Sequence, residues 1–315
     1  MRHIAVLFET KEILELTPVS AQEGISLPET QSEFYGRINK EVYLETVNKL
    51  LKHIKRGDIY EINFCIEFFA EDIEINPYKV FNRLKALTEA PFAQLYKAGD
   101  KWIICASPER FIKKQENKLI TQPMKGTAPR GKNDAEDFYF KNNLAKSLKE
   151  QTENVMAVDV ARNDLSIVAK KGTVITEELF GVQTFKNVHQ MVSTVTCELK
   201  ENITFEHIID ATFPPASMTG APKIKAVELI KKYELSPRGI YSGCLGSINE
   251  TGDFDFCVVI RSIIYDEKQK HVSFHVGSAI TANCNPEDEW DECLLKADAM
   301  LQALGKNIKE INFLR

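Results

Sequence analysis

The sequence predicts an α+β protein with antiparallel sheet. Segments with helical spacing of apolar residues alternate along the chain with segments of strand spacing, and the last third is rich in strand-like segments. Short turns join those strands: NETGD at residues 249–253 and DEKQK at residues 266–270. A turn of this length makes a hairpin, because a parallel connection needs a dozen or more residues. Antiparallel strands mixed with helices indicate the α+β class.

The first predicted elements are a helix and a strand in direct succession. Residues 41–56 carry apolar side chains at helical spacing, and Gly57 is a typical C-terminal stop. From Tyr60 to Phe68 every second residue is apolar, which predicts a strand with one buried face.

The remaining elements follow in mixed order. Asn76 and Pro77 suit the cap and first turn of a helix, whose inner face would carry Val80, Leu84 and Leu87. Strands are expected at 102–106, 119–122, 241–248, 254–260 and 272–276, and helices at 134–148, after Pro222, and from Asn285 and Pro286 to Gly305.

Composition limits the classes of function. The chain has 315 residues and a net charge of −5 without a long basic run, which argues against nucleic-acid binding. No apolar stretch approaches the ~20 residues that span a bilayer, and the run IAVLF is too short for a secretory signal. The seven cysteines form no C-x-x-C pair, which disfavours zinc and predicts small buried side chains. We therefore expect a cytoplasmic protein with no membrane or nucleic-acid partner.

Two pairs of glutamates could form a metal site. Glu150 and Glu153 are three residues apart in a helical pattern, and Glu289 and Glu292 repeat that spacing. Each pair can share a helix face, and carboxylate oxygens at a common point would suit Mg²⁺. The alternative is that these are solvated surface glutamates.

Two loops could bind or attack a substrate. The stretch PPASMTGAPK places Ser217, Thr219 and Gly220 just before Pro222, where a helix start can hold an anion, although a plain helix entry gives the same pattern. In PMKGT, Lys125 precedes Gly126, which would let a ligand approach the backbone. A lysine with a lowered pKa could act as a nucleophile; otherwise it is solvated.

Taken together, the motifs resemble one family, the chorismate-utilising enzymes. They occur in the family's order from about residue 40 to 305: SPERF (107–111), PMKGT (123–127), ENVMAVDVARNDL (153–165), TGAPK (219–223), RGIYSG (238–243), VIRS (259–262) and the EDEWDECLLKA segment. The resemblance implies a four-layer α/β/β/α fold with two orthogonally packed antiparallel sheets. Residues 41–315 would form the catalytic domain. Residues 1–40 would be a shortened N-terminal segment, without the pocket through which tryptophan inhibits many members.

The resemblance also implies site residues. Glu153 and Glu292 would bind Mg²⁺, with Glu150 and Glu289 in support. The chorismate site would be lined by Gly126, Thr127, Thr219, Gly220, Tyr241, Arg261, the backbone of Gly277, Ser278 and Ala279, and Lys296. An arginine such as Arg261 can grip a carboxylate of this dianionic substrate with two hydrogen bonds.

Lys125 distinguishes between members of the family. Anthranilate synthases carry Ala at this position of the motif, whereas aminodeoxychorismate synthases carry Lys. In the mechanism implied for the latter, the lysine amine adds at C2 of the ring as the 4-hydroxyl leaves, and ammonia then adds at C4 and expels the lysine. Glu109, in SPERF, would shuttle the protons. Ammonia would come from a separate glutamine amidotransferase subunit, and the product would serve 4-aminobenzoate and folate synthesis.

Three positions depart from the family pattern. Glu61 stands where ammonia-using members commonly have Gln and water-using members have Lys, Gln190 replaces a common His, and Ala279 replaces a Gly. These departures and the shortened N-terminus leave open a chorismate-binding subunit without catalytic activity. Anthranilate synthase component I is a second alternative, which Lys125 disfavours.

Overall fold

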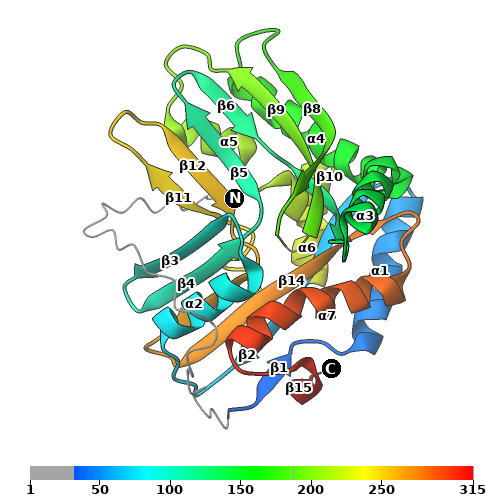
Figure 1. Ribbon diagram of the computed structural model, residues 1–315, viewed down its shortest axis with the longest axis vertical. Helices are drawn as coiled ribbons and strands as arrows, with labels where there is room; N and C mark the ends of the chain where they lie inside the picture. The colour runs from blue at the N-terminus through cyan, green and yellow to red at the C-terminus, as the bar shows by residue number, and fades with distance from the viewer. Residues whose placement is uncertain (1–31, 187, 315) are drawn as a thin grey trace.

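The computed structural model describes residues 32–186 and 188–314, in which two β-sheets lie one above the other (Figure 1). The predicted N-terminal segment 1–40, with its IAVLF run, lies outside the described residues as far as residue 31. The first sheet has the order β15 (Ile311–Phe313), β1 (Phe34–Gly36), β2 (Glu61–Ala70), β14 (His271–Thr281), β13 (Ser262–Asp266), β4 (Lys101–Ser107), β3 (Phe92–Ala98), and the short β10 (Gly220–Ala221) pairs with β2. The second has the order β11 (Cys244–Ile248), β12 (Phe254–Val258), β5 (Arg110–Gln115), β6 (Lys118–Thr121), β9 (Val188–Glu198), β7 (Met124–Pro129), and β8 (Ile175–Thr184) pairs with β9.

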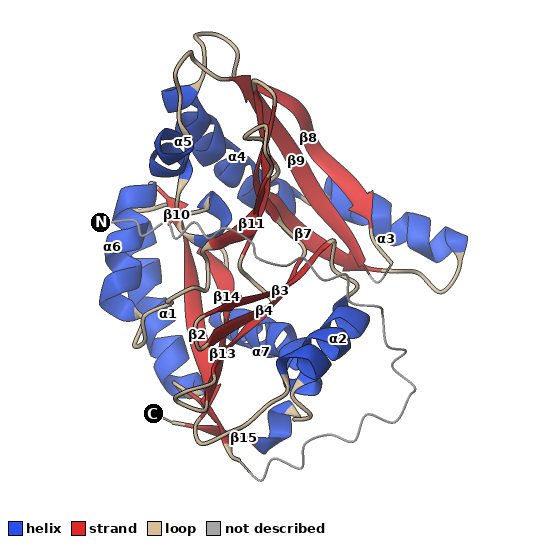
Figure 2. Cartoon of the chain, turned by 90° about the vertical axis from the view of Figure 1, so that its left-hand side faces the viewer, coloured by secondary structure: helices blue, strands red, loops and turns tan. Residues whose placement is uncertain are grey.

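Helices cover both sheets (Figures 1 and 2). The first sheet packs against α1 (Lys40–Lys55), α2 (Pro77–Thr88), α6 (Lys223–Tyr233) and α7 (Pro286–Ala303). The second packs against α3 (Asp134–Lys146), α4 (Leu148–Val168) and α5 (Phe205–Thr212). The sheets meet each other through apolar clusters, one of which contains Cys65 and Val258 and the other Ile103 and Cys257. The predicted α+β class, with two sheets and helices outside them, is confirmed.

Local sequence signals set the helix ends as predicted. The Asn76 side chain accepts a hydrogen bond from Lys79 N at 3.1 Å, and Pro77 occupies the first turn of α2. Asn285 accepts from Glu287 N at 3.1 Å at the start of α7. An asparagine oxygen satisfies a backbone N–H that the helix leaves unpaired, and proline has no such N–H to satisfy.

The burial of two predicted elements differs from the prediction. All residues of β2 are buried, not one face alone. Helices cover one side, and on the other side Cys65 packs in the apolar cluster of the second sheet and Glu61 pairs with Lys125. Tyr60 precedes the strand and is 62% exposed. On α2, Leu87 is 40% exposed, and Phe81 packs in the core with Val80 and Leu84 instead.

Three other features were also not predicted: a division between two helices, the end of a strand, and a parallel pair of strands. Residues 134–148 do not form one helix, because Ser147 ends α3 and caps α4 by accepting a hydrogen bond from Glu150 N at 3.4 Å. The predicted strand 254–260 ends at Val258, where the chain crosses to the first sheet with Arg261 at φ 50°. β1 and β15 pair in parallel; they lie far apart in the chain, so no hairpin constrains their direction.

Among the described residues, no helix combines the length and the apolar character needed to cross a bilayer.

Candidate active site

Lys125 lies on β7 with its side chain 9% exposed, and its amine forms an ion pair with the Glu61 carboxylate, which is 6% exposed. Glu61 is the first residue of β2, so this pair links the two sheets. Gly126 has φ 83°, and a Cβ there would lie 2.8 Å from Glu150 Oε2. Glycine is therefore required for β7 to pass this close to α4.

The charges around Lys125 keep its amine protonated. Burial by itself lowers the pKa of Lys125, but the carboxylates of Glu61, Glu153 and Glu109 outweigh burial and raise it above its ordinary value. The lowered pKa that was named as the condition for a nucleophilic lysine is therefore not met by these surroundings alone. Lys125 has to give up a proton before it can act as a nucleophile.

Glu109 follows β4 and is 6% exposed. Its backbone is fixed by two hydrogen bonds: its N–H donates to Ser107 Oγ at 3.2 Å, and its carbonyl accepts from Val258 N at 3.0 Å. Burial raises the pKa of its carboxyl to about 7, although nearby Lys125 opposes the increase. A carboxyl with this pKa can take up and release a proton near neutral pH.

The two glutamate-bearing helices lie next to each other. Lys149 Nζ on α4 is 4.0 Å from Glu289 Oε1 on α7, and the charges of Glu150 and Glu292 act on each other. The solvated-surface alternative fails for Glu153 and Glu289, which are 8% and 3% exposed.

The surroundings shift the pKa values of these four glutamates in different directions. Burial raises the pKa of Glu150 and Glu289, and raises that of Glu153 to about 7. Burial would also raise the pKa of Glu292, but Lys296, whose Nζ lies 2.5 Å from Glu292 Oε1, holds it below the ordinary value.

The donor chemistry of these glutamates fits Mg²⁺. Mg²⁺ prefers oxygen ligands, takes one or two carboxylates and keeps several waters. Buried carboxylates with raised pKa values are short of compensating positive charge, which a divalent cation would supply. Within the part of the chain that the structure describes, however, no three His, Cys, Asp or Glu side chains form a ready-made metal site.

Of the predicted substrate-binding residues, Lys296 lies on α7 and Arg261 contacts that helix. Lys296 Nζ donates to the Gly277 carbonyl at 2.8 Å, and Arg261 Nη1 donates to the Lys296 carbonyl at 3.2 Å. A Cβ at Gly277 would lie 2.6 Å from Asn63 Oδ1, so β14 can pass this side chain only with glycine. A guanidinium and an ammonium therefore lie close to the acidic cluster.

The predicted anion-binding loop packs against β2. Thr219 O accepts from Asn63 N at 2.8 Å. Gly220 has φ 144°, and a Cβ there would lie 2.1 Å from Glu61 O. The loop therefore lies against the strand that carries the partner of Lys125.

The remaining predicted substrate-binding residues differ in how accessible their side chains are. The Ser278 hydroxyl lies 2.8 Å from Tyr43 Oη, among buried residues, so only its backbone is available. Tyr241 is 5% exposed and stacks on His275. Thr127 is exposed, and Ala279 pairs with Asn63 of β2.

Glu61 is the residue whose role sequence reasoning left open. The strand pattern could have indicated where this side chain lies. Glu61 and Asn63 occupy the positions of β2 between the apolar residues, and a strand turns such side chains to the opposite face.

Comparison with known proteins assigns the family. The family model of chorismate binding enzymes matches residues 7–302. The chain therefore belongs to the chorismate binding enzymes.

Curated relatives include aminodeoxychorismate synthase from Streptomyces griseus, 36% identical over 270 residues, which cover 85% of this chain and 37% of the relative. Aminodeoxychorismate synthase component 1 from Bacillus subtilis is 32% identical over 298 residues, which cover 95% and 62%. The solved structure of anthranilate synthase component I from Streptococcus pneumoniae matches with a TM-score of 0.77 and 27% identity, covering 85% of this chain and 59% of that one. The chain thus spans about two fifths to three fifths of the length of these proteins.

Proposed function

We propose that this chain is the component I of an aminodeoxychorismate synthase and converts chorismate and ammonia to 4-amino-4-deoxychorismate. The observation that carries the proposal is a buried amine, Lys125, on a glycine-flanked strand among carboxylates. The similarity to the two aminodeoxychorismate synthases supports it. The product would enter 4-aminobenzoate and folate synthesis in the cytoplasm, and a separate glutamine amidotransferase subunit would supply ammonia.

The first half of the reaction needs a proton acceptor and then a proton donor. Lys125 would give a proton to a neighbouring carboxylate, and its neutral amine would form a bond to C2 of the ring. The electron pair of the ring shifts as the bond from C4 to the hydroxyl breaks, and the hydroxyl leaves as water with the proton that the carboxylate took up. Glu109 suits both tasks because its pKa is about 7.

The second half restores the enzyme. Ammonia forms a bond to C4, the bond from C2 to the lysine nitrogen breaks, and Lys125 leaves as an amine that regains its proton. The enolpyruvyl group stays on the ring throughout, which distinguishes this product from anthranilate.

Glu153 and Glu292 would hold Mg²⁺, with Glu150 and Glu289 beside them. The bound ion would supply positive charge for a carboxylate of chorismate. Arg261 and Lys296 add positive charge near the same helix. Gly126 allows the close approach of Glu150, and Gly220 allows that of the Glu61 carbonyl.

Product analysis tests this function. The protein is incubated with chorismate, Mg²⁺ and ammonium, and the products are identified by liquid chromatography with mass spectrometry. We expect 4-amino-4-deoxychorismate from the unmodified protein, loss of that product in Lys125→Ala, and no change in Lys268→Ala, which alters an exposed lysine.

Other outcomes favour the alternatives. Release of anthranilate and pyruvate would assign the activity of the structurally similar anthranilate synthase instead. Chorismate binding without turnover, even with an amidotransferase added, would indicate a binding subunit. Undiminished 4-amino-4-deoxychorismate formation by Lys125→Ala would refute the covalent role of Lys125.

A further inference from the structure

Glu61 is in direct contact with the amine that the proposed function makes the nucleophile. The Lys125 amine donates a hydrogen bond to the Glu61 carboxylate, within an ion pair of side chains that are 9% and 6% exposed. Glu153 and Glu109 act on Lys125 only through their charge. A proton passes between groups in hydrogen-bond contact, and water has little access to an amine buried to this extent. Within the described part of the chain, the geometry therefore favours Glu61 as the proton acceptor.

The backbone holds these two side chains in place. The pairing of β7 with β9 shifts register across Lys125 and Gly126, where β7 carries one residue more than β9. Such a bulge changes the direction of a side chain and is common next to active sites. Glu61 pairs with Ala221 of β10 on one side and with Thr281 of β14 on the other. The contact therefore joins two groups that the sheets keep in position.

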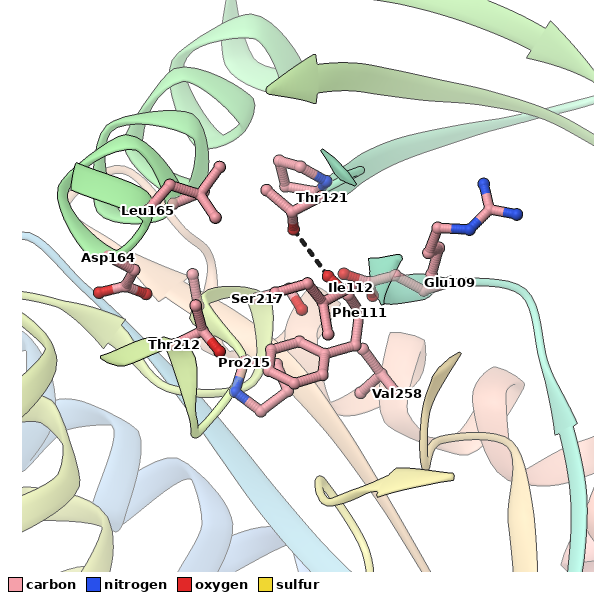
Figure 3. Close-up of a pocket in the computed structure, with 14 residues that line it drawn as sticks. Glu109, Phe111, Ile112, Thr121, Asp164, Leu165, Thr212, Pro215, Ser217 and Val258 are labelled. Atoms are coloured by element: carbon pink, nitrogen blue, oxygen red, sulfur yellow. Dashed lines mark hydrogen bonds between the residues drawn. The ribbon is translucent and has the colours of Figure 1, made fainter. Parts of the chain in front are cut away.

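Glu109 makes its contacts elsewhere. Its carboxyl is hydrogen-bonded to the Ser217 hydroxyl and to the backbone N–H of Met124. Figure 3 shows Glu109 and Ser217 in the lining of a cavity beside the second sheet. With a pKa of about 7, this carboxyl carries a proton in about half of the molecules at neutral pH. Its pKa would suit either proton transfer, but the Lys125 amine contacts Glu61 instead, which leaves Glu109 to act as an acid.

We propose that Glu61 is the base that takes the proton from Lys125, and that Glu109 is the acid that protonates the leaving hydroxyl. The proposal rests on the proposed function and divides between two carboxyl groups the proton transfers that this function requires. Glu61 begins as the charged partner of Lys125, and Glu109 begins with its proton bound, so each group starts in the state that its task needs.

The protons balance over the two halves of the reaction. Transfer from Lys125 to Glu61 leaves a neutral amine, which bonds to C2 of the ring as the bond from C4 to oxygen breaks, and the hydroxyl takes the Glu109 proton and leaves as water. Ammonia then bonds to C4, and the bond from C2 to the lysine nitrogen breaks, which releases a neutral amine. Glu61 returns its proton to that amine, and Glu109 takes one from the new ammonium group at C4. All three side chains end as they began.

Formation of the covalent adduct without ammonia tests the assignment. The protein is mixed with saturating chorismate and Mg²⁺ in the absence of ammonium, and mass spectrometry of the intact chain follows the adduct of Lys125. Glu61→Gln should form the adduct at least about a hundredfold more slowly, since a general base contributes about 10²- to 10⁴-fold. Glu61→Asp keeps a carboxylate and should recover about tenfold of that loss or more. Glu67→Gln, at another buried glutamate of β2, should keep the unmodified rate.

A second readout separates a base from a charge that only raises the pKa of Lys125. If Glu61 were only such a charge, Glu61→Gln should speed both adduct formation and the labelling of Lys125 by formaldehyde and a reductant. If Glu61 is the base, labelling should become faster, because buffer accepts the proton of an amine that is no longer paired, while adduct formation becomes slower.

The two proposals fail in different ways. Adduct formation by Glu61→Gln at the unmodified rate or faster would overturn the role of Glu61 and leave the proposed function intact. An unmodified protein that forms no adduct with chorismate would refute the covalent function, and the role of Glu61 with it.

Discussion

The buried carboxyl of Glu109 should make the folded chain less stable as the pH rises. Its pKa is about 7 in the folded protein and about 4.5 when the chain unfolds. Between these values the folded state binds the extra proton, so the free energy of unfolding falls with increasing pH and levels off above pH 7. Glutamine has the shape of the protonated acid but does not ionise, so Glu109→Gln should remove this dependence.

The expected size follows from proton linkage. With these pKa values, ionisation of Glu109 costs the folded state about 1 kcal/mol at pH 5 and about 3 kcal/mol at pH 8. We compare the free energy of unfolding of Glu109→Gln with that of the unmodified protein. The difference in favour of the variant should be about 2 kcal/mol larger at pH 8 than at pH 5. A catalytic carboxylate would thus lower stability at the pH where the enzyme works.

Denaturant unfolding at pH 5 and pH 8 measures the effect. Trp102 and Trp290 are 8% and 4% exposed in the core of the first sheet, so their fluorescence reports unfolding. Glu201→Gln serves as the control, since it removes the same charge from an exposed position. A difference between Glu109→Gln and the unmodified protein that is the same at both pH values would refute the reasoning, because it would mean that burial does not change the protonation of Glu109.

Three further predictions follow from the same contacts. Glu61→Gln should make the Lys125 amine react faster with formaldehyde and a reductant at pH 7, because one charge that raises the pKa of Lys125 is gone; peptide mass spectrometry would detect it, and slower labelling would contradict it. Gly220→Ala should abolish turnover and lower the melting temperature, because its Cβ would lie 2.1 Å from a backbone oxygen, whereas Gly99→Ala, with open space around it, should keep turnover. Phe274→Ala should lower the free energy of unfolding by about 3–5 kcal/mol in denaturant titrations, since the ring is fully buried, and a loss under ~1 kcal/mol would count against that packing.

Helix ends and hairpins were predictable because their causes are local. Asn76 with Pro77 and Asn285 with Pro286 satisfy or avoid the unpaired N–H groups of one helix turn. The turn at 249–253 joins β11 to β12 as a hairpin, and the turn at 266–270 joins β13 to β14. In both cases the deciding atoms lie within a few residues of each other.

Burial was harder to predict. The alternation from Tyr60 to Phe68 correctly indicated a strand, but nothing within it showed that Lys125 of the second sheet would lie against Glu61. The same limit applies to Leu87, whose helical spacing suits the core although the residue is 40% exposed.

The motifs of the chain are enough to specify its family, because a family pattern depends on the order of side chains. They could not specify that Lys125 pairs with Glu61, which lies 64 residues away, or that its amine is held as a cation. Electrostatic energy depends on distance and burial. Only the packing of β2, β7, α4 and α7 decides which charges meet, and therefore which proton must move before Lys125 can react.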